Sequence, residues 1–215
     1  MASYPINLNL KDRLCIVIGG GRVAWRKVNR LLDTGAKLRI VSPHVIEELT
    51  ELIRLNQIEY YQKFYEKKDI MGAFLVICAT DNKQVNALIG EDAQKNGALV
   101  NVVDDSYPSD FTVPAQIKQG DLLLTISTSG KSPEVARQLR MELESIYGHK
   151  SYADFITLVA SFREKLKHMD IPSSQRELFW RQMINNEVLE FVRNGEISIV
   201  EARFKNAISS FRAES

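Results

Sequence analysis

The first half of the chain alternates apolar runs, which fit strands, with amphipathic stretches, which fit helices. The run LCIVI at 14–18 is continuously apolar, as is AFLVICAT at 73–80, and this predicts strands buried on both faces of a sheet. Because strands that alternate with helices need crossover connections, we expect a parallel sheet within residues 1 to about 105. The predicted strands cover 14–18, 37–43, 58–65, 73–80 and 98–104, and the predicted helices cover 23–34, 44–56 and 85–97.

The second half of the chain no longer alternates predicted strands with helices. Two β-rich runs within 110–128 flank a Gln-Gly-Asp stretch at 119–121, which predicts a hairpin-like turn. Ser132 followed by Pro133 predicts the start of a helix, because serine caps a first turn and proline fits one. The predicted helix covers 132–147, and an all-helical remainder covers 151–215 with a break at 171–174.

A glycine turn follows the first predicted strand. The sequence GGGRVA at 19–24 satisfies G-x-G-x-x-A where a strand passes into a helix. In this motif Gly19 permits a tight turn, Gly21 lets the backbone approach a pyrophosphate, and Ala24 keeps the helix close to the strand. The free N–H groups of the helix start then face the anion. The pattern predicts dinucleotide binding, against the alternative of a glycine turn that binds nothing.

The end of the second predicted strand lacks the acid that commonly accepts from the ribose hydroxyls. The residues there are Val41, Ser42, Pro43 and His44. Ser42 or backbone groups can serve the ribose instead, and His44 or Arg22 can tolerate a 2′-phosphate. The motif therefore leaves the choice between NAD and NADP open.

The stretch ATDN at 79–82 follows the 73–80 apolar run, at the sheet edge where ligands bind in such folds. Ala79 and Thr80 are small enough to let a cofactor pass. A plain strand-to-helix turn with Asp81 or Asn82 as the helix N-cap explains the stretch equally well, and both interpretations can hold together.

The composition narrows the class of protein. The 215 residues are 45% hydrophobic and 26% charged with a formal net charge of +1, so no basic field favours nucleic acid. Cys15 and Cys78 lie in apolar runs and are expected to be buried thiols rather than a disulfide. The start of the chain lacks a signal-peptide core and no run reaches the length of a membrane span, so we expect a cytoplasmic protein. The three histidines are far apart, which argues against a structural metal site.

Several stretches together resemble the precorrin-2 dehydrogenase / sirohydrochlorin ferrochelatase family, which is the dehydrogenase module of siroheme synthase. The likeness runs in order from residue 1 to about 148, whereas the tail resembles the family only in its position and helical character. The stretches are GGGRVAWRK (19–27), CATDNKQVN (78–86), NVVDD (101–105), DFTVPAQ (110–116) and STSGKSPEVARQLR (127–140).

The resemblance implies an NAD-dependent oxidation of precorrin-2 to sirohydrochlorin, and in some members the insertion of ferrous iron. It also implies an α/β protein that forms a homodimer with interlocked subunits. The implied parts are a Rossmann-type NAD-binding domain at 1–112, a central α+β dimerisation region at 113–148 and an all-α C-terminal domain at 149–215.

The resemblance also assigns site residues. An absent ribose acid is typical of this family, so NAD becomes the favoured cofactor. The acid that bifunctional members use falls on Asp104, although Asp105 beside it leaves the assignment open. Metal insertion also stays open, because a carboxylate at this position can accept a proton or bind the incoming iron or cobalt. The cofactor contacts fall on Gly19, Gly21, Arg22, Val23, Pro43 and His44, to which the position of Thr80 at the sheet edge adds a seventh.

A tetrapyrrole with several carboxylates needs cationic and N–H donors in its pocket. The helix that starts after STSGKS can hold an anion at its N-terminus, and two arginines three residues apart share one of its faces. A solvated helix face is the alternative for these charges. Thr128 replaces a serine that some family members carry, so a regulatory role at this position is doubtful. The candidate substrate-binding residues are Ser127, Thr128, Lys131, Arg137 and Arg140.

Two other functions fit the glycine turn less well. A short-chain dehydrogenase is disfavoured because no Tyr-x-x-x-Lys pair follows the Rossmann half. An NAD-binding regulatory module without catalysis has a similar glycine turn, but it leaves NVVDD and STSGKSPEVARQLR unexplained.

Overall fold

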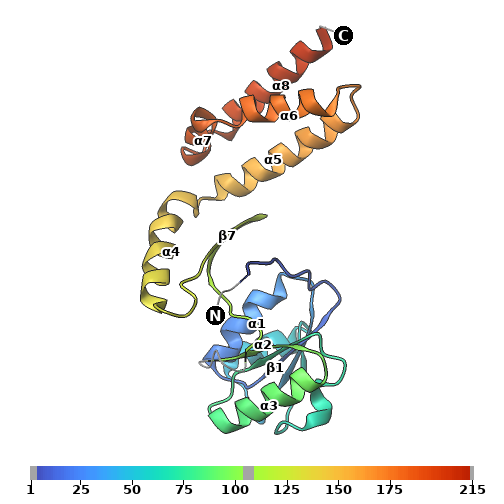
Figure 1. The fold of residues 1–215 in the computed structure, drawn as a ribbon, viewed down its shortest axis with the longest axis vertical. Helices are drawn as coiled ribbons and strands as arrows, with labels where there is room; N and C mark the ends of the chain where they lie inside the picture. Colours follow the sequence, from blue (N-terminus) through green and yellow to red (C-terminus); the bar gives the residue numbers. More distant parts are fainter. Residues whose placement is uncertain (1–3, 104–108, 214–215) are drawn as a thin grey trace. The chain divides into compact units, whose positions relative to one another are not determined.

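The computed structural model describes residues 4–103 and 109–213, without the side chains of 210–213. The chain divides into two compact units, one that ends at Val113 and one that begins at Pro114. Figure 1 shows the first unit in blue to green and the second in yellow-green to red.

The first unit contains a five-stranded parallel sheet with the strand order β3-β2-β1-β4-β5. Neighbouring strands keep a regular parallel register: Cys15 in β1 pairs with Leu38 in β2 on one side and with Leu75 in β4 on the other. This confirms the predicted α/β class. The strands are β1 (Leu14–Ile18), β2 (Lys37–Val41), β3 (Glu59–Tyr61), β4 (Leu75–Cys78) and β5 (Leu99–Val102), and the helices are α1 (Arg22–Leu32), α2 (Glu47–Arg54), η1 (Lys67–Ile70) and α3 (Lys83–Lys95).

Helices cover both faces of this sheet, α1 and α2 on one face and α3 on the other (Figure 1). Because side chains alternate along a strand, Val17 of β1 packs with the apolar stripe of α1, and its neighbour Ile16 packs with Ile89 of α3. Both positions are almost completely buried, which explains why the strand runs are continuously apolar.

Strand β1 has its predicted bounds and α3 is shifted by two residues, whereas the other strands of the sheet and the helices α1 and α2 are shorter than predicted. Helix α2 begins at Glu47 rather than at 44, because the segment before it turns back to the glycine turn, where the Ile46 N–H donates to the Gly20 carbonyl at 2.9 Å. Helix α1 ends at Leu32, and Gly35, with φ of +71°, lies in the turn that follows. The first predicted β-rich run forms a strand only from Ala115 on, and before it the Asp110 N–H donates to the Val100 carbonyl of β5 at 2.9 Å.

The second unit begins with an antiparallel hairpin and continues with helices. Ser132 caps α4 by accepting from the Val135 N–H at 3.3 Å, as the sequence predicts. The helical structure is interrupted between the end of α5 and Ser173, where the sequence predicts a break. The elements are β6 (Ala115–Gln119), β7 (Leu122–Ile126), α4 (Pro133–Tyr147), α5 (Lys150–Lys167), α6 (Ser173–Met183), α7 (Asn186–Arg193) and α8 (Ile197–Ala213).

An aromatic core holds the last helices together. The ring centroids of Phe162 and Phe204 lie 5.5 Å apart and nearly perpendicular, and Trp180 meets Phe204 edge-on at 5.7 Å. Such edge-to-face pairs stabilise a core beyond the area that they bury. Among the residues that the structure describes, no helix combines the length and the apolar character that crossing a membrane requires.

Candidate dinucleotide site

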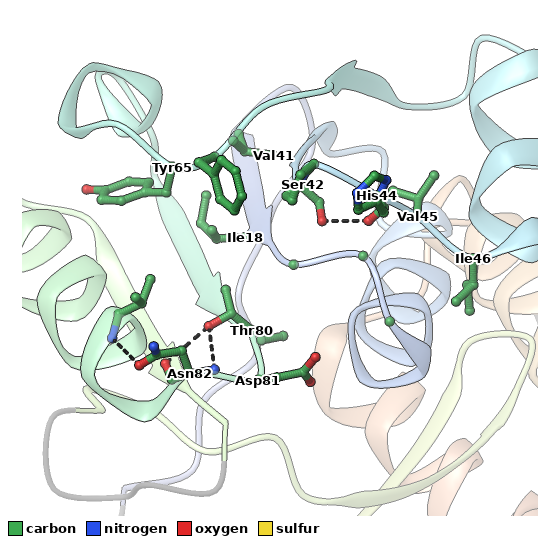
Figure 2. A pocket seen from close by; sticks show the side chains of 17 residues that line it. Ile18, Val41, Ser42, His44, Val45, Ile46, Tyr65, Thr80, Asp81 and Asn82 are labelled. Atoms are coloured by element: carbon green, nitrogen blue, oxygen red, sulfur yellow. Dashed lines mark hydrogen bonds between the residues drawn. The ribbon is translucent and has the colours of Figure 1, made fainter.

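A cavity of about 550 Å³ opens at the carboxyl edge of the parallel sheet (Figure 2). Its walls come from the ends of β1, β2 and β4, from the start of α3 and from the segment that follows β3. The chain leaves β1 toward β2 on one side and later returns to β4 on the other, so the cavity lies at the point where the strand order reverses. Open α/β sheets bind their ligands at this point.

Glycine is required at the first two positions of the turn by close approach of other backbone. Gly19 has φ of +125°, and a Cβ there would overlap the Ala79 carbonyl oxygen and lie 2.7 Å from its carbon. A Cβ at Gly20 would overlap the carbonyl oxygen of His44 and lie 2.8 Å from the Ser42 hydroxyl. The motif treats the Gly20 position as free, so the sequence interpretation missed this constraint.

Gly21 differs from its two neighbours. A Cβ there would have none of the described atoms within 4 Å, and the backbone has φ of −90°, which any residue adopts. Gly21 is the N-cap of α1 and has no side chain with which to cap it, so the first N–H groups of the helix remain available to an anion. Arg22, which is exposed, and Val23, which is half-buried, follow it in the first turn. This open backbone next to a helix start fits a pyrophosphate.

The end of β2 is closed by its own hydrogen bonds. The Ser42 hydroxyl donates to the His44 carbonyl at 2.6 Å, and Ser42 is only 7% exposed (Figure 2). The Tyr60 hydroxyl donates to the Ser42 carbonyl at 3.0 Å. The Ser42 hydroxyl has therefore used its only proton and is buried, so the backbone of Pro43 and the exposed His44 are the more accessible groups for a ribose.

Thr80 lies at the cavity, and its polar groups are held by Asn86 of α3. The Asn86 side-chain oxygen accepts from the Thr80 hydroxyl at 2.6 Å and from its N–H at 3.1 Å, while its amide donates to the Thr80 carbonyl at 2.9 Å. Asn82 caps α3 by accepting from the Gln84 and Val85 N–H groups. The 79–82 stretch is thus a capped turn and a cavity wall at once. Asn86, a buried polar side chain, gave no signal in the sequence.

The candidate substrate residues lie in the second unit, in the loop before α4 and on that helix. The Thr128 hydroxyl donates to the Ser132 carbonyl at 3.0 Å and accepts from its N–H at 3.1 Å, so it holds the loop closed. Arg137 pairs with Glu134 at 3.2 Å, and Arg140 pairs with Glu144.

The remaining two candidates differ from these in their contacts. The hydroxyl of Ser127 accepts from the Ser129 N–H at 3.1 Å, and Lys131 is exposed.

Asp104 and Asp105 lie outside the described residues. The strand before them is anchored by hydrogen bonds. Asn101 of β5 accepts from the Lys27 ammonium at 3.2 Å and donates to the Phe111 carbonyl at 3.0 Å. The candidate acid therefore follows a strand end that is anchored to α1. Across the described part of the chain, no cluster of three or more His, Cys, Asp or Glu side chains fits a metal ion.

The pKa values of two buried thiols in the sheet and of the Tyr65 phenol at the cavity are raised. Burial raises the pKa of Cys15 to about 11 and that of Cys78 to about 12, so both thiols stay protonated at neutral pH. Burial and a hydrogen bond to Asp92 raise the pKa of Tyr65, which lines the cavity. These groups are inert wall and core residues rather than nucleophiles.

Comparisons with known proteins agree with this geometry. A family model described as NAD(P)-binding matches residues 6–115, and a second, described as the sirohaem synthase dimerisation region, matches residues 151–208. The first match confirms the cofactor class that the glycine turn and the resemblance predict. The second match lies C-terminal to 113–148, the range for which the resemblance implies dimerisation.

Similar proteins include two siroheme synthases. The chain is 35% identical over 208 residues to one from Photorhabdus laumondii subsp. laumondii, which covers 97% of this chain and 44% of the relative. It is 32% identical over 214 residues to one from Chromobacterium violaceum, which covers 100% of this chain and 45% of the relative. The chain thus spans less than half the length of these curated relatives.

A solved structure also matches. The chain superposes on SirC, a precorrin-2 dehydrogenase, with a TM-score of 0.79 and 28% sequence identity, over 97% of this chain and 100% of the other. Together with the family matches, this confirms the resemblance found in the sequence.

Proposed function

Since this chain belongs to the family of the siroheme synthase dehydrogenase module, we propose that it oxidises precorrin-2 to sirohydrochlorin with NAD as the hydride acceptor. The observation that carries the proposal is the cavity at the carboxyl edge of the sheet, which joins the glycine turn to the open N-terminus of α1. The likeness to SirC, a precorrin-2 dehydrogenase, over nearly the whole chain supports the choice of substrate.

The residues of the first unit would hold the dinucleotide as follows. NAD supplies the hydride acceptor when bound. The open backbone at Gly21 and the N–H groups of Arg22 and Val23 face its pyrophosphate, where the helix start favours negative charge. The backbone of Pro43 and the side chain of His44 take the ribose side, since the Ser42 hydroxyl is already bonded.

Cations of the second unit would bind the carboxylates of the tetrapyrrole. Lys131 is exposed, whereas Arg137 and Arg140 must exchange their pairs with Glu134 and Glu144 for the substrate. Exposed ion pairs of this kind are worth at most about 1 kcal/mol, so the exchange is energetically easy.

Oxidation also releases a proton, and we assign its acceptor to Asp104 or its neighbour Asp105. The loss of one hydride to NAD and one proton to a carboxylate balances the removal of two hydrogens from the macrocycle. The same carboxylate can bind a ferrous ion that enters as a substrate, so insertion of iron into sirohydrochlorin forms the second part of the proposal.

We also propose that the protein works as a homodimer in the cytoplasm. The match of residues 151–208 to a sirohaem synthase dimerisation region supports self-association. The two buried free thiols, Cys15 and Cys78, suit a reducing compartment.

The test is an anaerobic assay of the purified chain with precorrin-2 and NAD. We expect the sirohydrochlorin spectrum and the NADH absorbance to appear together in equal amounts. Ferrous or cobalt ion is then added to parallel samples, and metal insertion is read from the further change in the tetrapyrrole spectrum. Folded protein that binds NAD but leaves precorrin-2 unchanged would contradict the proposal and favour a regulatory module instead.

A further inference from the structure

Phe64 is the most exposed aromatic side chain at the cavity. It is 79% exposed, although it lines the same cavity as the glycine turn. A single exposed apolar residue is common on protein surfaces and needs no explanation by itself. At the wall of a ligand cavity, however, an aromatic ring that is open to solvent in the free protein offers a face on which a ligand can stack.

The residues on both sides of Phe64 are held in place. The Lys63 ammonium pairs with the buried carboxylate of Asp69 at 3.0 Å and with Glu66 at 3.1 Å. The Tyr65 hydroxyl donates to Asp92 at 3.1 Å, and its ring packs against the core cluster of the sheet. Phe64 is thus presented from a backbone that is fixed at its two neighbours, and an aromatic side chain loses little further freedom when it binds a flat ring.

The strand order says which part of a dinucleotide reaches Phe64. The glycine turn after β1 takes the pyrophosphate, and the end of β2 takes the adjacent ribose. The next strand in the same direction is β3, and Phe64 lies three residues beyond its end. The base attached to that ribose therefore lies toward β3, while the nicotinamide half lies toward β4.

The wall beside Phe64 is apolar. Ile18, Val41 and Tyr65 gather on one side of the cavity, away from His44 and Val45 (Figure 2). A slot with apolar walls and an aromatic ring at its mouth suits a flat heteroaromatic base better than a charged or branched group.

We propose that Phe64 is the residue on which the adenine ring of the dinucleotide stacks. The inference rests on the proposed dinucleotide site and adds to it a residue that fixes the adenine half. Stacking also explains how the site reads the adenosine end although the end of β2 carries no ribose acid.

The first test measures binding to the full chain by calorimetry with three probes: NAD, ADP-ribose, which lacks the nicotinamide, and nicotinamide mononucleotide, which lacks the adenine. Phe64→Ala should weaken NAD and ADP-ribose about tenfold, or about 1.4 kcal/mol, in the range that the loss of a base–aromatic stack produces. The affinity for nicotinamide mononucleotide should stay within twofold, and Phe64→Tyr should restore tight binding. Met71→Ala is the matched control, because Met71 is 66% exposed and lies outside the cavity wall.

The second test places a reporter at the same position. In Phe64→Trp, ADP-ribose should quench the emission of the added tryptophan, whereas the added tryptophan of Met71→Trp should not respond. ADP-ribose binding by Phe64→Ala within twofold of wild type, at an unchanged melting temperature, would overturn the inference, as would equal losses for all three probes. If the wild-type chain binds neither NAD nor ADP-ribose, the proposed function fails with it, so the two failures are told apart.

Discussion

The substitutions Gly19→Ala and Gly21→Ala should damage the protein in two different ways, although the residues are only two positions apart. At Gly19 a methyl group would overlap the Ala79 carbonyl, and the φ of +125° is strained for any residue with a Cβ. At Gly21 the methyl would enter open space at the start of α1. We therefore expect Gly19→Ala to lower stability and Gly21→Ala to lower cofactor affinity.

The magnitudes follow from these two environments. A backbone in a sparsely populated region costs about 1–3 kcal/mol, and forcing an extra methyl into packed structure costs about 1–3 kcal/mol. Gly19→Ala should thus lower the free energy of unfolding by about 2–6 kcal/mol, a large part of the ~5–15 kcal/mol that holds a typical domain folded. Gly21→Ala should change stability by less than about 0.5 kcal/mol. Its methyl occupies the approach of the pyrophosphate, so NAD binding should weaken at least tenfold.

The assay follows urea unfolding through Trp25 of α1, in a Trp180→Phe background that leaves one tryptophan in the chain. NAD affinity is measured by calorimetry on the same proteins, and Gly21→Asp, which adds a carboxylate beside the pyrophosphate, should abolish binding. An unchanged unfolding midpoint for Gly19→Ala would refute the tight approach to Ala79. NAD binding by Gly21→Ala within twofold of wild type would refute our placement of the pyrophosphate.

Further predictions concern the cavity wall, the buried thiols and the candidate acid. Asn86→Ala should lower the free energy of unfolding by about 1–3 kcal/mol, because it leaves buried polar groups of the 79–82 turn without their partner; urea denaturation checks this. Burial raises the thiol pKa values of Cys15 and Cys78 from 9.0 to about 11 and about 12, so stability should fall as pH rises above about 9, by about 1.4 kcal/mol per pH unit for each thiol. The double variant with alanine at both positions should lose that share of the slope, and an unaltered slope would contradict it. Asp104→Ala should impair metal insertion, or both activities if this residue accepts the proton, and Asp105→Ala tests the alternative assignment of the acid. Wild-type rates of Asp104→Ala in both assays would mean that Asp104 has neither role.

The sheet was predictable because its information is local. A strand buried on both faces has to be apolar at every position. The runs LCIVI at 14–18 and LVIC within 73–80 can therefore be recognised as strands from the sequence. The start of α4 was predictable for the same reason, since Ser132 and Pro133 act within one turn. The ends of β1 were also predictable, but β2, β3 and β4 end before their predicted runs do. Ladder pairing with a neighbour decides where a strand stops, and the sequence runs continue into the cavity wall.

The site was predictable only where its chemistry follows from one short motif. The glycine pattern marks Gly19 and Gly21, but it treats Gly20 as replaceable. Gly20 is required because the segment after β2 folds back over it, and that segment is held by the bond from the Ser42 hydroxyl to the His44 carbonyl. This contact brings together residues that are more than twenty positions apart in the sequence. Neither the spacing nor the residue types predict it.

The three glycines therefore have three different environments, and we assign only that of Gly21 to the ligand. The missing Cβ of Gly19 makes room for the backbone after β4, and that of Gly20 makes room for the backbone after β2. At Gly21 none of the described atoms occupies the space that a Cβ would take. The same fold-back that requires Gly20 also uses the only side-chain hydroxyl at the end of β2. One fold-back therefore accounts both for the requirement for Gly20 and for the bonded state of the Ser42 hydroxyl. We assign recognition of the adenosine half to the backbone of Pro43 and to the ring of Phe64.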